Sequence, residues 1–490
     1  MNLENLSGLQ IGKLVNDGII KPTEVIEYFK DRVEKRDKSI NAFTYTKFDE
    51  AFDEAIKLEE RLKSNEYVGP FAGVPVALKD FLPSKKGWQN SHGGVKSLIR
   101  IDDADSEFCK SAEKLGAIPI GKTNAPAFGF SGACQNKLYG ATRNPFNTDY
   151  TCGGSSGGTA AAVSDGLIAF GEGGDAGGSI RIPSGWCNLF GFKPSLGTVP
   201  SYCRPDAWTA THPYCFNGCL TKTVEDSAMM LNSMAHFDPR DPISLPINSR
   251  KDFYELMKRH IKDMKIGFTY DFDMYPVDPE VAKAIDETIK QIRFTGAKVE
   301  HVHFNFKHTL EEIMFCWAWS ISVDTALDLS MWKEQGLDLI KDHRDELPEE
   351  FIHYNEVAAD ANIFSFRKFN EIRTDILDNF EDKFEDYDLI ISPTACCPPM
   401  KIEDEGKIKE VNGTIMNPDY SFIEFGETPM VNFVGYPAAS VPSGLIYDNL
   451  PTGMQVIGRK YHDEDVLSLS YTIEQIKPWS YNIPNDRKLD

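Results

Sequence analysis

The sequence is poor in positive charge and has no long hydrophobic run. Its 490 residues include 52 Lys and Arg against 74 Asp and Glu, which gives a formal net charge of −22. A surface this acidic repels phosphate backbones and anionic lipid headgroups, so we expect no nucleic-acid partner. No apolar run approaches the roughly 18 residues that a membrane span needs, and the first residues, MNLENLSGLQIGKLV, lack the basic-then-apolar order of a signal peptide. We therefore expect a cytoplasmic protein that does not contact a membrane.

Cysteine and histidine form no recognisable metal or redox motif. The ten cysteines are scattered, and the close pairs are Cys215 with Cys219 and Cys396 with Cys397. Neither spacing matches a zinc knuckle or a CxxC motif, so we expect reduced, mostly buried thiols. His301 and His303, with His308 nearby, have no Cys or carboxylate partner in a recognised motif, and we interpret them as ordinary surface or core residues. The sequence therefore predicts no metal site.

Short apolar runs alternate with helical patterns along the chain. With 41% hydrophobic residues over this length, the chain can bury a large core. From Pro22 to about Arg36 apolar residues recur at three-to-four spacing, and Thr23 is placed to cap that helix. Further helices are expected at 48–63, 106–115 and 157–163, and short buried strands at 74–78, 118–120, 167–170, 265–268, 389–392 and 438–441. The alternation predicts a layered α/β fold with a largely buried sheet.

Residues 238–386 differ from the rest, because they form long, charged and aromatic helical segments such as MFCWAWSISVDTALDLSMW. We expect a mainly helical insertion that covers one face of the sheet and supplies walls of a substrate pocket. Its tryptophans, Trp317, Trp319 and Trp332, either line that pocket or pack the insertion, and the sequence leaves both alternatives open. The same two alternatives apply to Cys316.

Three serines in two glycine-rich settings are the strongest chemical signal. Ser155 and Ser156 lie in GGSSGG and Ser179 lies in GGDAGGSIRIP, while Lys79 closes the apolar run GVPVALK. Small hydroxyls together with a lysine that would be buried suggest a nucleophile with its proton relay. GGSSGG is less well explained as a phosphate loop, since no Walker lysine follows it, or as a structural turn beside a surface lysine.

Five motifs carry a family resemblance: GVPVALKD around Lys79, GKTNAPAFG from Gly121, ATRNPFN from Ala141, GGSSGG from Gly153 and GGDAGGSIRIP from Gly173. In this order, and with Ser179 placed 24 positions after Ser155, the chain resembles the amidase signature family, serine hydrolases that cleave carboxamides. The resemblance implies one amidase domain over 1–490, with the catalytic core at 65–210. It also implies a large mixed central β-sheet covered by helices on both faces, with the helical insertion at 238–386.

The resemblance also implies roles for individual residues. Ser179 would be the nucleophile, Ser155 a bridging hydroxyl after a cis peptide bond from Gly154, and Lys79 the general base. The oxyanion hole would consist of Ala176, Gly177, Gly178 and Ser179, and Ser156, Asp175 and Arg181 would support the site. Apart from these roles, Asn124, Cys316 and Trp317 are our candidates for contact with the substrate, with packing of the insertion still open for Cys316 and Trp317.

The physical chemistry of a lysine base agrees with these roles. An ammonium has no lone pair to accept a proton, so Lys79 must be neutral when the reaction starts, and burial favours the neutral form. A second hydroxyl can accept one proton while it donates another, which lets the lysine act at a distance. This chemistry needs no metal and no organic cofactor.

Differences from the family pattern concern the substrate. Many relatives have glutamate where this chain has Ala127, and threonine where it has Gly174 and Ala176. The glutaminase subunit of the tRNA-dependent amidotransferase usually has a SLDQIGP-like segment where this chain has YCFNGCLTKTVED. The chain is more similar to general amidases and to 6-aminohexanoate cyclic dimer hydrolases. We therefore favour a stand-alone amidase for a small or medium, linear or cyclic amide over a glutaminase subunit or a catalytically silent binding protein. A homodimer is common among such relatives, but no residue here indicates one.

Overall fold

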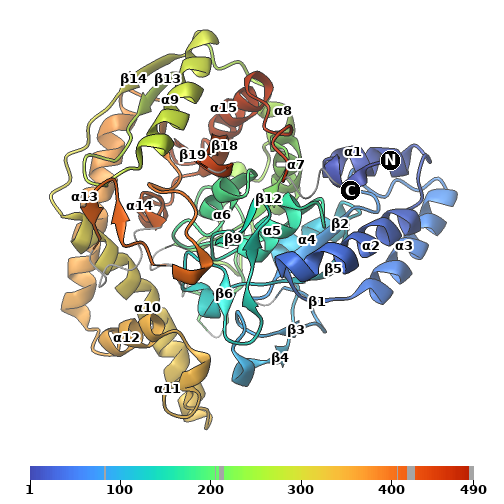
Figure 1. The fold of residues 1–490 in the computed structure, drawn as a ribbon, viewed down its shortest axis with the longest axis horizontal. Helices are drawn as coiled ribbons and strands as arrows, with labels where there is room; N and C mark the ends of the chain where they lie inside the picture. The colour runs from blue at the N-terminus through green and yellow to red at the C-terminus, as the bar shows by residue number, and fades with distance from the viewer. Residues whose placement is uncertain are drawn as a thin grey trace.

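Eleven strands form one mixed sheet through the centre of the molecule (Figure 1). In order across the sheet they are β1 (Phe43–Thr46), β5 (Ile118–Thr123), β2 (Pro75–Lys79), β10 (Phe170–Asp175), β12 (Phe216–Thr221), β11 (Phe190–Lys193), β18 (Ala438–Ile446), β19 (Leu450–Gly458), β15 (Leu389–Pro393), β13 (Lys265–Phe268) and β14 (Lys298–His301). Two groups, β5-β2-β10 and β15-β13-β14, are parallel, and the other neighbours are antiparallel. The predicted large mixed sheet is confirmed.

The computed structural model describes residues 1–81, 84–204, 206–208, 214–404, 407–416, 425–447 and 449–484. Its α-helices are α1 (Gly8–Asn16), α2 (Pro22–Ile40), α3 (Phe48–Lys63), α4 (Glu107–Lys114), α5 (Gly157–Ser164), α6 (Arg181–Trp186), α7 (Val224–Met234), α8 (Phe253–Leu256), α9 (Pro279–Phe294), α10 (Leu310–Glu334), α11 (Leu339–Asp342), α12 (Glu349–Ala358), α13 (Ile363–Phe384), α14 (Thr428–Val434) and α15 (Asp463–Ile476). Short 3-10 turns lie at Leu3–Asn5, Lys96–Leu98, Ala127–Gly129, Pro246–Asn248, Arg344–Glu346 and Ile402–Asp404. Short hairpins pair β3 (Gln89–Asn90) with β4 (Arg100–Ile101), β6 (Gln135–Asn136) with β7 (Gly140–Ala141), β8 (Arg143–Asn144) with β9 (Asn147–Thr151), and β16 (Glu410–Val411) with β17 (Thr414–Ile415).

Helices cover both faces of the sheet. Side chains of α4, α7, α8, α9 and α15 pack on one face, and those of α5, α6, α10, α13 and α14 pack on the other. The strands alternate between these layers: Leu389 and Ile391 of β15 enter the first, whereas Ile390 enters the second. Because both faces are covered, strands such as β2, β5 and β15 are buried along their whole length.

Most predicted elements are present, several with shifted ends such as β5 and β18, and the main differences concern α2 and β10. Helix α3 and strand β13 have the predicted bounds, whereas α2 continues to Ile40. The N-cap of α2 is Lys21 and not Thr23, whose hydroxyl instead donates to Glu59 of α3. Strand β10 begins at Phe170, so the predicted strand at 167–170 is placed too early: its glycine-rich sequence carries little strand signal, and pairing with β12 decides its extent.

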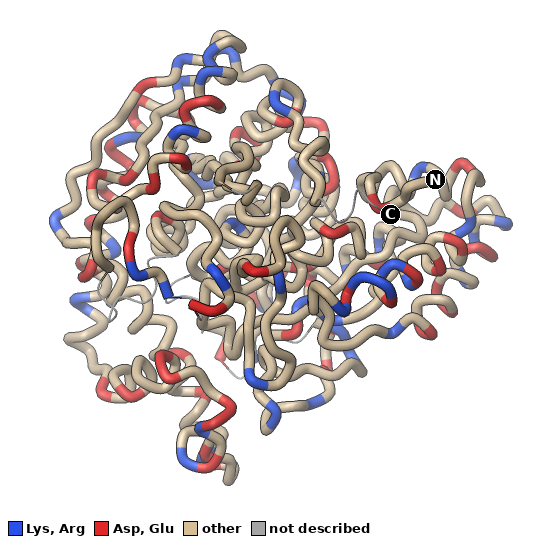
Figure 2. The backbone as a smooth tube through the Cα atoms, viewed as in Figure 1, with Lys and Arg blue, Asp and Glu red and all other residues tan. Residues whose placement is uncertain are grey.

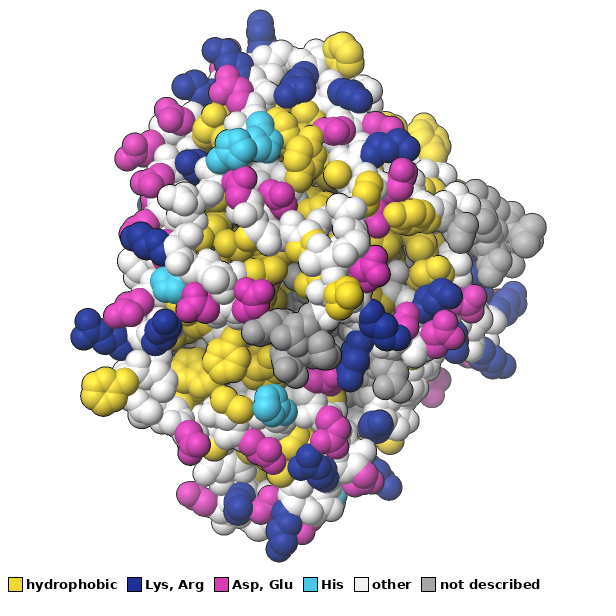
Figure 3. Space-filling view, turned by 60° about the vertical axis from the view of Figure 1, so that its left-hand side comes forward, with side chains coloured by type: hydrophobic (Ala, Val, Ile, Leu, Met, Phe, Trp, Pro, Cys, Tyr) yellow, Lys and Arg dark blue, Asp and Glu magenta, His cyan; other side chains and the backbone are white. Residues whose placement is uncertain are grey.

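The 238–386 region contributes two strands as well as helices. Strands β13 and β14 extend one edge of the sheet, and α10 to α13 lie together at the left and lower left of Figure 1, where they share one hydrophobic core with α6, α14 and the sheet. Within this layer Trp319 packs against Phe366 and Phe369 of α13. Figure 3 turns this side toward the reader and shows hydrophobic side chains among charged ones.

Charged residues of both signs are distributed around the outside of the molecule, while the central part of the view carries few (Figure 2). All ten cysteines are free thiols, and eight of them are buried, as predicted. In the described part of the chain, no helix combines the length and apolar character needed to cross a bilayer.

Candidate active site

Lys79 and Ser155 form a buried hydrogen-bonded pair. Lys79 is the last residue of β2 and is 5% exposed, and its Nζ lies 2.7 Å from Ser155 Oγ. Burial lowers the pKa of Lys79 to about 8, although the nearby acidic groups of Cys134, Asp175 and Glu172 oppose this shift. A lysine at this position therefore exchanges its proton near neutral pH.

The peptide bond between Gly154 and Ser155 is cis, as the resemblance predicted. It lies in the loop before α5, and the residue after it, Ser156, is the N-cap of that helix. Gly129 borders the pair, since a Cβ on it would lie 3.2 Å from Ser155 Oγ. The Phe81 ring lies on another side, with its centroid 5.4 Å from Lys79 Nζ.

Ser179 lies in the loop between β10 and α6, and it is 5% exposed. The Ser156 N–H donates to the Ser179 carbonyl at 3.2 Å, which joins this loop to the cis-peptide loop. The Ser156 hydroxyl lies 3.4 Å from the backbone of Gly174. The fold thus brings both glycine-rich segments to one place, and Ser156 holds them together by hydrogen bonds.

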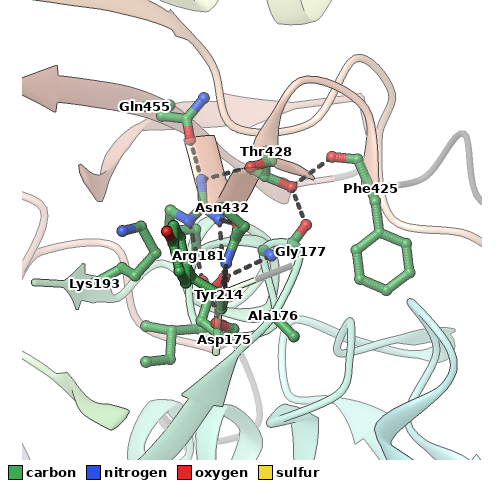
Figure 4. Close-up of polar contacts among 12 residues, drawn as sticks. Asp175, Ala176, Gly177, Arg181, Lys193, Tyr214, Phe425, Thr428, Asn432 and Gln455 are labelled. Carbon is green, nitrogen blue, oxygen red and sulfur yellow. Dashed lines mark hydrogen bonds and ion pairs between the residues drawn. The ribbon is translucent and has the colours of Figure 1, made fainter. Parts of the chain in front are cut away.

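The Asp175 carboxylate anchors the loop that carries Ser179 (Figure 4). It accepts from the N–H groups of Gly178 at 2.7 Å and Ile180 at 3.1 Å, and from the Arg181 guanidinium at 2.9 and 3.0 Å. Burial alone would raise the pKa of Asp175, but Arg181 together with Lys193 and Asn432 outweighs it and holds that pKa well below its usual range. This agrees with the bracing role expected for Asp175 and Arg181.

Arg181 connects the loop to the C-terminal part of the chain. Its guanidinium also donates to the Gln455 side chain in β19, and to the Thr428 carbonyl and Asn432 side chain in α14. All these groups are buried, so the cluster links two strands and two helices (Figure 4).

Each carbonyl of the loop 175–178 has a donor. The Asp175 carbonyl accepts from Asn432 Nδ2, that of Ala176 from Trp317 Nε1 at 3.0 Å, that of Gly177 from Thr428 Oγ1 at 2.6 Å, and that of Gly178 from the Ile182 N–H at 2.8 Å. The loop carbonyls are therefore fixed by groups from α10, α14 and α6.

The N–H groups of the same loop are used differently. Gly178 donates to Asp175. The other three predicted donors, Ala176, Gly177 and Ser179, have no acceptor for their N–H groups among the described residues. A trans peptide directs its N–H opposite to its C=O, so pinning the carbonyls leaves these three N–H groups fixed and available to a negative oxygen.

The three residues expected at the substrate lie in different surroundings. The Asn124 amide donates to Gly140 and Thr142 and accepts from Asn136, so it holds the neighbouring loop. Cys316 is buried in the insertion, where burial raises the pKa of its thiol to about 12. Of the three, Trp317 is the one that contacts the Ser179 loop.

Thr428, Asn432 and Gln455 contact this site but were not predicted. They are between 247 and 274 residues from the groups they bind. Only Asn432 had a signal in the sequence, because it is the first residue of NFVGYPAASVPSG, a segment that also resembles the family. That segment does not indicate a role for Asn432. His303 and His308 pair with Asp273 and Asp375 outside this site.

A family model described as Amidase matches residues 24–467. The chain belongs to the amidase family. This amidase is 28% identical over 485 residues to an acylamidase from Rhodococcus erythropolis, covering 99% of this chain and 98% of that protein. It is also 29% identical over 507 residues to a glutamyl-tRNA(Gln) amidotransferase subunit from Clostridium botulinum, covering 99% of this chain and 100% of that protein.

Solved structures extend the comparison. The amidase matches a bacterial aryl acylamidase of the amidase signature family with a TM-score of 0.93 and 35% identity, covering 97% of each chain. It matches 6-aminohexanoate cyclic dimer hydrolase with a TM-score of 0.85 and 25% identity, covering 99% of each. The chain is a hydrolase of carbon–nitrogen bonds with the amidase signature fold.

Proposed function

We propose that this amidase cleaves carboxamides through an acyl-enzyme on Ser179, with Ser155 as the proton relay and Lys79 as the base. The observation that carries the proposal is the buried Lys79–Ser155 hydrogen bond of 2.7 Å together with the lowered pKa of Lys79. A neutral amine held against a hydroxyl can take its proton, which makes that hydroxyl a proton acceptor for a neighbouring nucleophile.

The steps balance without a further group. Ser155 passes its proton to neutral Lys79 and takes the proton of Ser179, whose oxygen attacks the amide carbon. The N–H groups of Ala176, Gly177 and Ser179 stabilise the resulting oxyanion. When the carbon–nitrogen bond breaks, the proton held by Lys79 returns through Ser155 to the leaving nitrogen, and Ser179 is acylated. Water then attacks the ester by the same relay and releases the carboxylic acid.

The substrate that we propose is a small or medium amide with an aromatic or apolar group, such as an aryl acylamide. The solved aryl acylamidase supports this choice by its 35% identity over 97% of each chain. Aromatic rings near the site agree with it: Phe81 lies beside Lys79, and Trp317 packs against Phe425 with ring centroids 4.7 Å apart.

A second candidate substrate is the 6-aminohexanoate cyclic dimer. The structural match to the hydrolase named for that compound supports this candidate. The alternative of a glutaminase subunit rests on sequence identity of 28–29% and is not favoured, since the same level of identity is found to an acylamidase.

Hydrolysis by the purified chain alone tests the proposal. We would compare p-nitroacetanilide and longer p-nitroanilides with the 6-aminohexanoate cyclic dimer and with glutamine, using Ser179→Ala as the control. We expect release of p-nitroaniline by the wild-type chain and none by the variant. Hydrolysis of glutamine in place of the neutral amides, or no hydrolysis of any amide, would overturn the proposal.

A further inference from the structure

Trp317 reaches from the helical insertion to the loop that carries Ser179. It lies in the second turn of α10, and its indole N–H donates to the Ala176 carbonyl at 3.0 Å. Its ring also packs directly over Gly177, because a Cβ at Gly177 would lie 2.3 Å from the ring carbon Cζ2. The contact therefore combines a hydrogen bond with close packing against backbone that has no side chain.

This hydrogen bond fixes the Ala176–Gly177 peptide group, whose carbonyl has no other donor among the described residues. Among the described residues, Trp317 is the donor to the Ala176 carbonyl, whereas Asn432, Thr428 and Ile182 hold the neighbouring carbonyls. The Ala176–Gly177 peptide shares its plane with the Gly177 N–H, which points away from the carbonyl that Trp317 holds. Glycine has wide backbone freedom, so a peptide next to two glycines needs such an external restraint to keep one direction.

We propose that Trp317 is a positioning residue that aims the Gly177 N–H at the oxyanion. The helical insertion thereby contributes to stabilisation of the transition state as well as to the walls around the substrate. The inference rests on the proposed function, because it assigns the Gly177 N–H to the oxyanion formed on attack by Ser179.

Trp317→Phe tests the inference because it keeps an aromatic ring and removes the N–H. Complete loss of one oxyanion donor reduces turnover by roughly 10²–10³-fold, and a donor that is present but poorly aimed retains part of that effect. We expect kcat for a p-nitroanilide to fall by about 10–100-fold with KM changed by less than about threefold. A tryptophan that only contacts the substrate would instead raise KM.

Trp319→Phe is the matched control. Trp319 lies two residues further along α10, is also buried, and packs against Phe366 and Phe369 of α13. We expect Trp319→Phe to keep the wild-type kcat. Affinity for a trifluoromethyl ketone, which forms an oxyanion on the nucleophile, should weaken in Trp317→Phe by the same factor as kcat and stay unchanged in Trp319→Phe.

If Trp317→Phe does not fold, β-(3-benzothienyl)alanine at position 317 keeps the shape of the indole and replaces its N–H by sulfur. An unchanged kcat in either Trp317 variant, or an equal loss in Trp319→Phe, would overturn the inference. A wild-type chain that hydrolyses no amide would contradict the proposed function itself, so the two failures are distinguishable.

Discussion

We expect Lys79, as the proposed base, to make the activity depend on pH. Its folded pKa of about 8 lies below the ordinary lysine value because the amine is buried, and the base is active only when neutral. We predict that kcat/KM rises about tenfold per pH unit below pH 8 and levels off above it, when measured from pH 6 to 10 with an uncharged amide. A flat profile over this range would contradict the assignment.

A variant of Glu172 checks whether Lys79 is the group that titrates in the rising part of the pH profile, called the limb below. Its carboxylate accepts from the Lys79 backbone N–H, and burial raises its own pKa to about 7. Because its negative charge raises the pKa of Lys79, Glu172→Gln should move the midpoint of the limb to lower pH. If the limb disappears in this variant, the titrating group is Glu172 and not Lys79.

Among single residues, the sequence predicts those that lie within a short recognisable motif. Lys79, Ser155 and Ser179 each lie within a short motif, and the fold brings Lys79 to Ser155 and the two serine loops to each other. Trp317 was a candidate for substrate contact or for packing of the insertion, but its indole N–H donates to a carbonyl 141 residues away in the chain. Such a hydrogen bond depends on tertiary packing, which no single segment of sequence encodes.

The loop between β10 and α6 is held by the buried Asp175–Arg181 ion pair, and the contribution of this pair to the free energy of unfolding can be measured. Asp175→Asn leaves the Arg181 guanidinium buried without its carboxylate, so we predict a loss of about 3–5 kcal/mol in the free energy of unfolding in urea. Asp17→Asn breaks the exposed Lys13–Asp17 pair, in which the side chains are 74% and 44% exposed, and should cost less than about 1 kcal/mol. Equal losses in the two variants would show that the buried pair has no special role.

Gly178 provides a second test of this loop. Its φ of +122° is disfavoured for other residues, and a Cβ there would lie 2.1 Å from Thr428 Oγ1. Gly18 also has a positive φ but has open space around it. We predict that Gly18→Ala lowers the free energy of unfolding by about 1 kcal/mol, whereas Gly178→Ala lowers it by more and also reduces kcat. Similar stability and turnover in the two variants would contradict the close packing at Gly178.

Elements with a clear apolar pattern could be predicted from the sequence. The apolar run before Lys79 and the amphipathic pattern at 48–63 correspond to β2 and α3. Strand β10 was placed too early because all of it after Phe170, GEGGD, has no such pattern, and its extent is set by pairing with β12. Register against a partner strand is a tertiary property, and it overrides the weak local preference.

The whole chain is needed to complete the sheet. Strands β10 and β11 belong to the expected catalytic core at 65–210, but β12 at 216–221 lies between them and β18 at 438–446 lies beside β11. The Arg181 guanidinium likewise donates hydrogen bonds to Asn432 and Gln455, which lie outside 65–210. We predict that residues 65–210 expressed alone show no cooperative thermal unfolding by circular dichroism, whereas the full chain does. Cooperative unfolding of the fragment would indicate an independent domain.

The most direct test of the account is covalent labelling of the proposed nucleophile. The full chain is exposed to a fluorophosphonate, and the adduct is located by intact mass and peptide mapping, in parallel with Ser179→Ala and Lys79→Met. We predict one adduct, on Ser179, that is absent from Ser179→Ala and forms at least about 10²-fold more slowly in Lys79→Met, since a positioned base contributes that much to the reaction. An adduct on another residue, or no adduct on the wild-type chain, would contradict it.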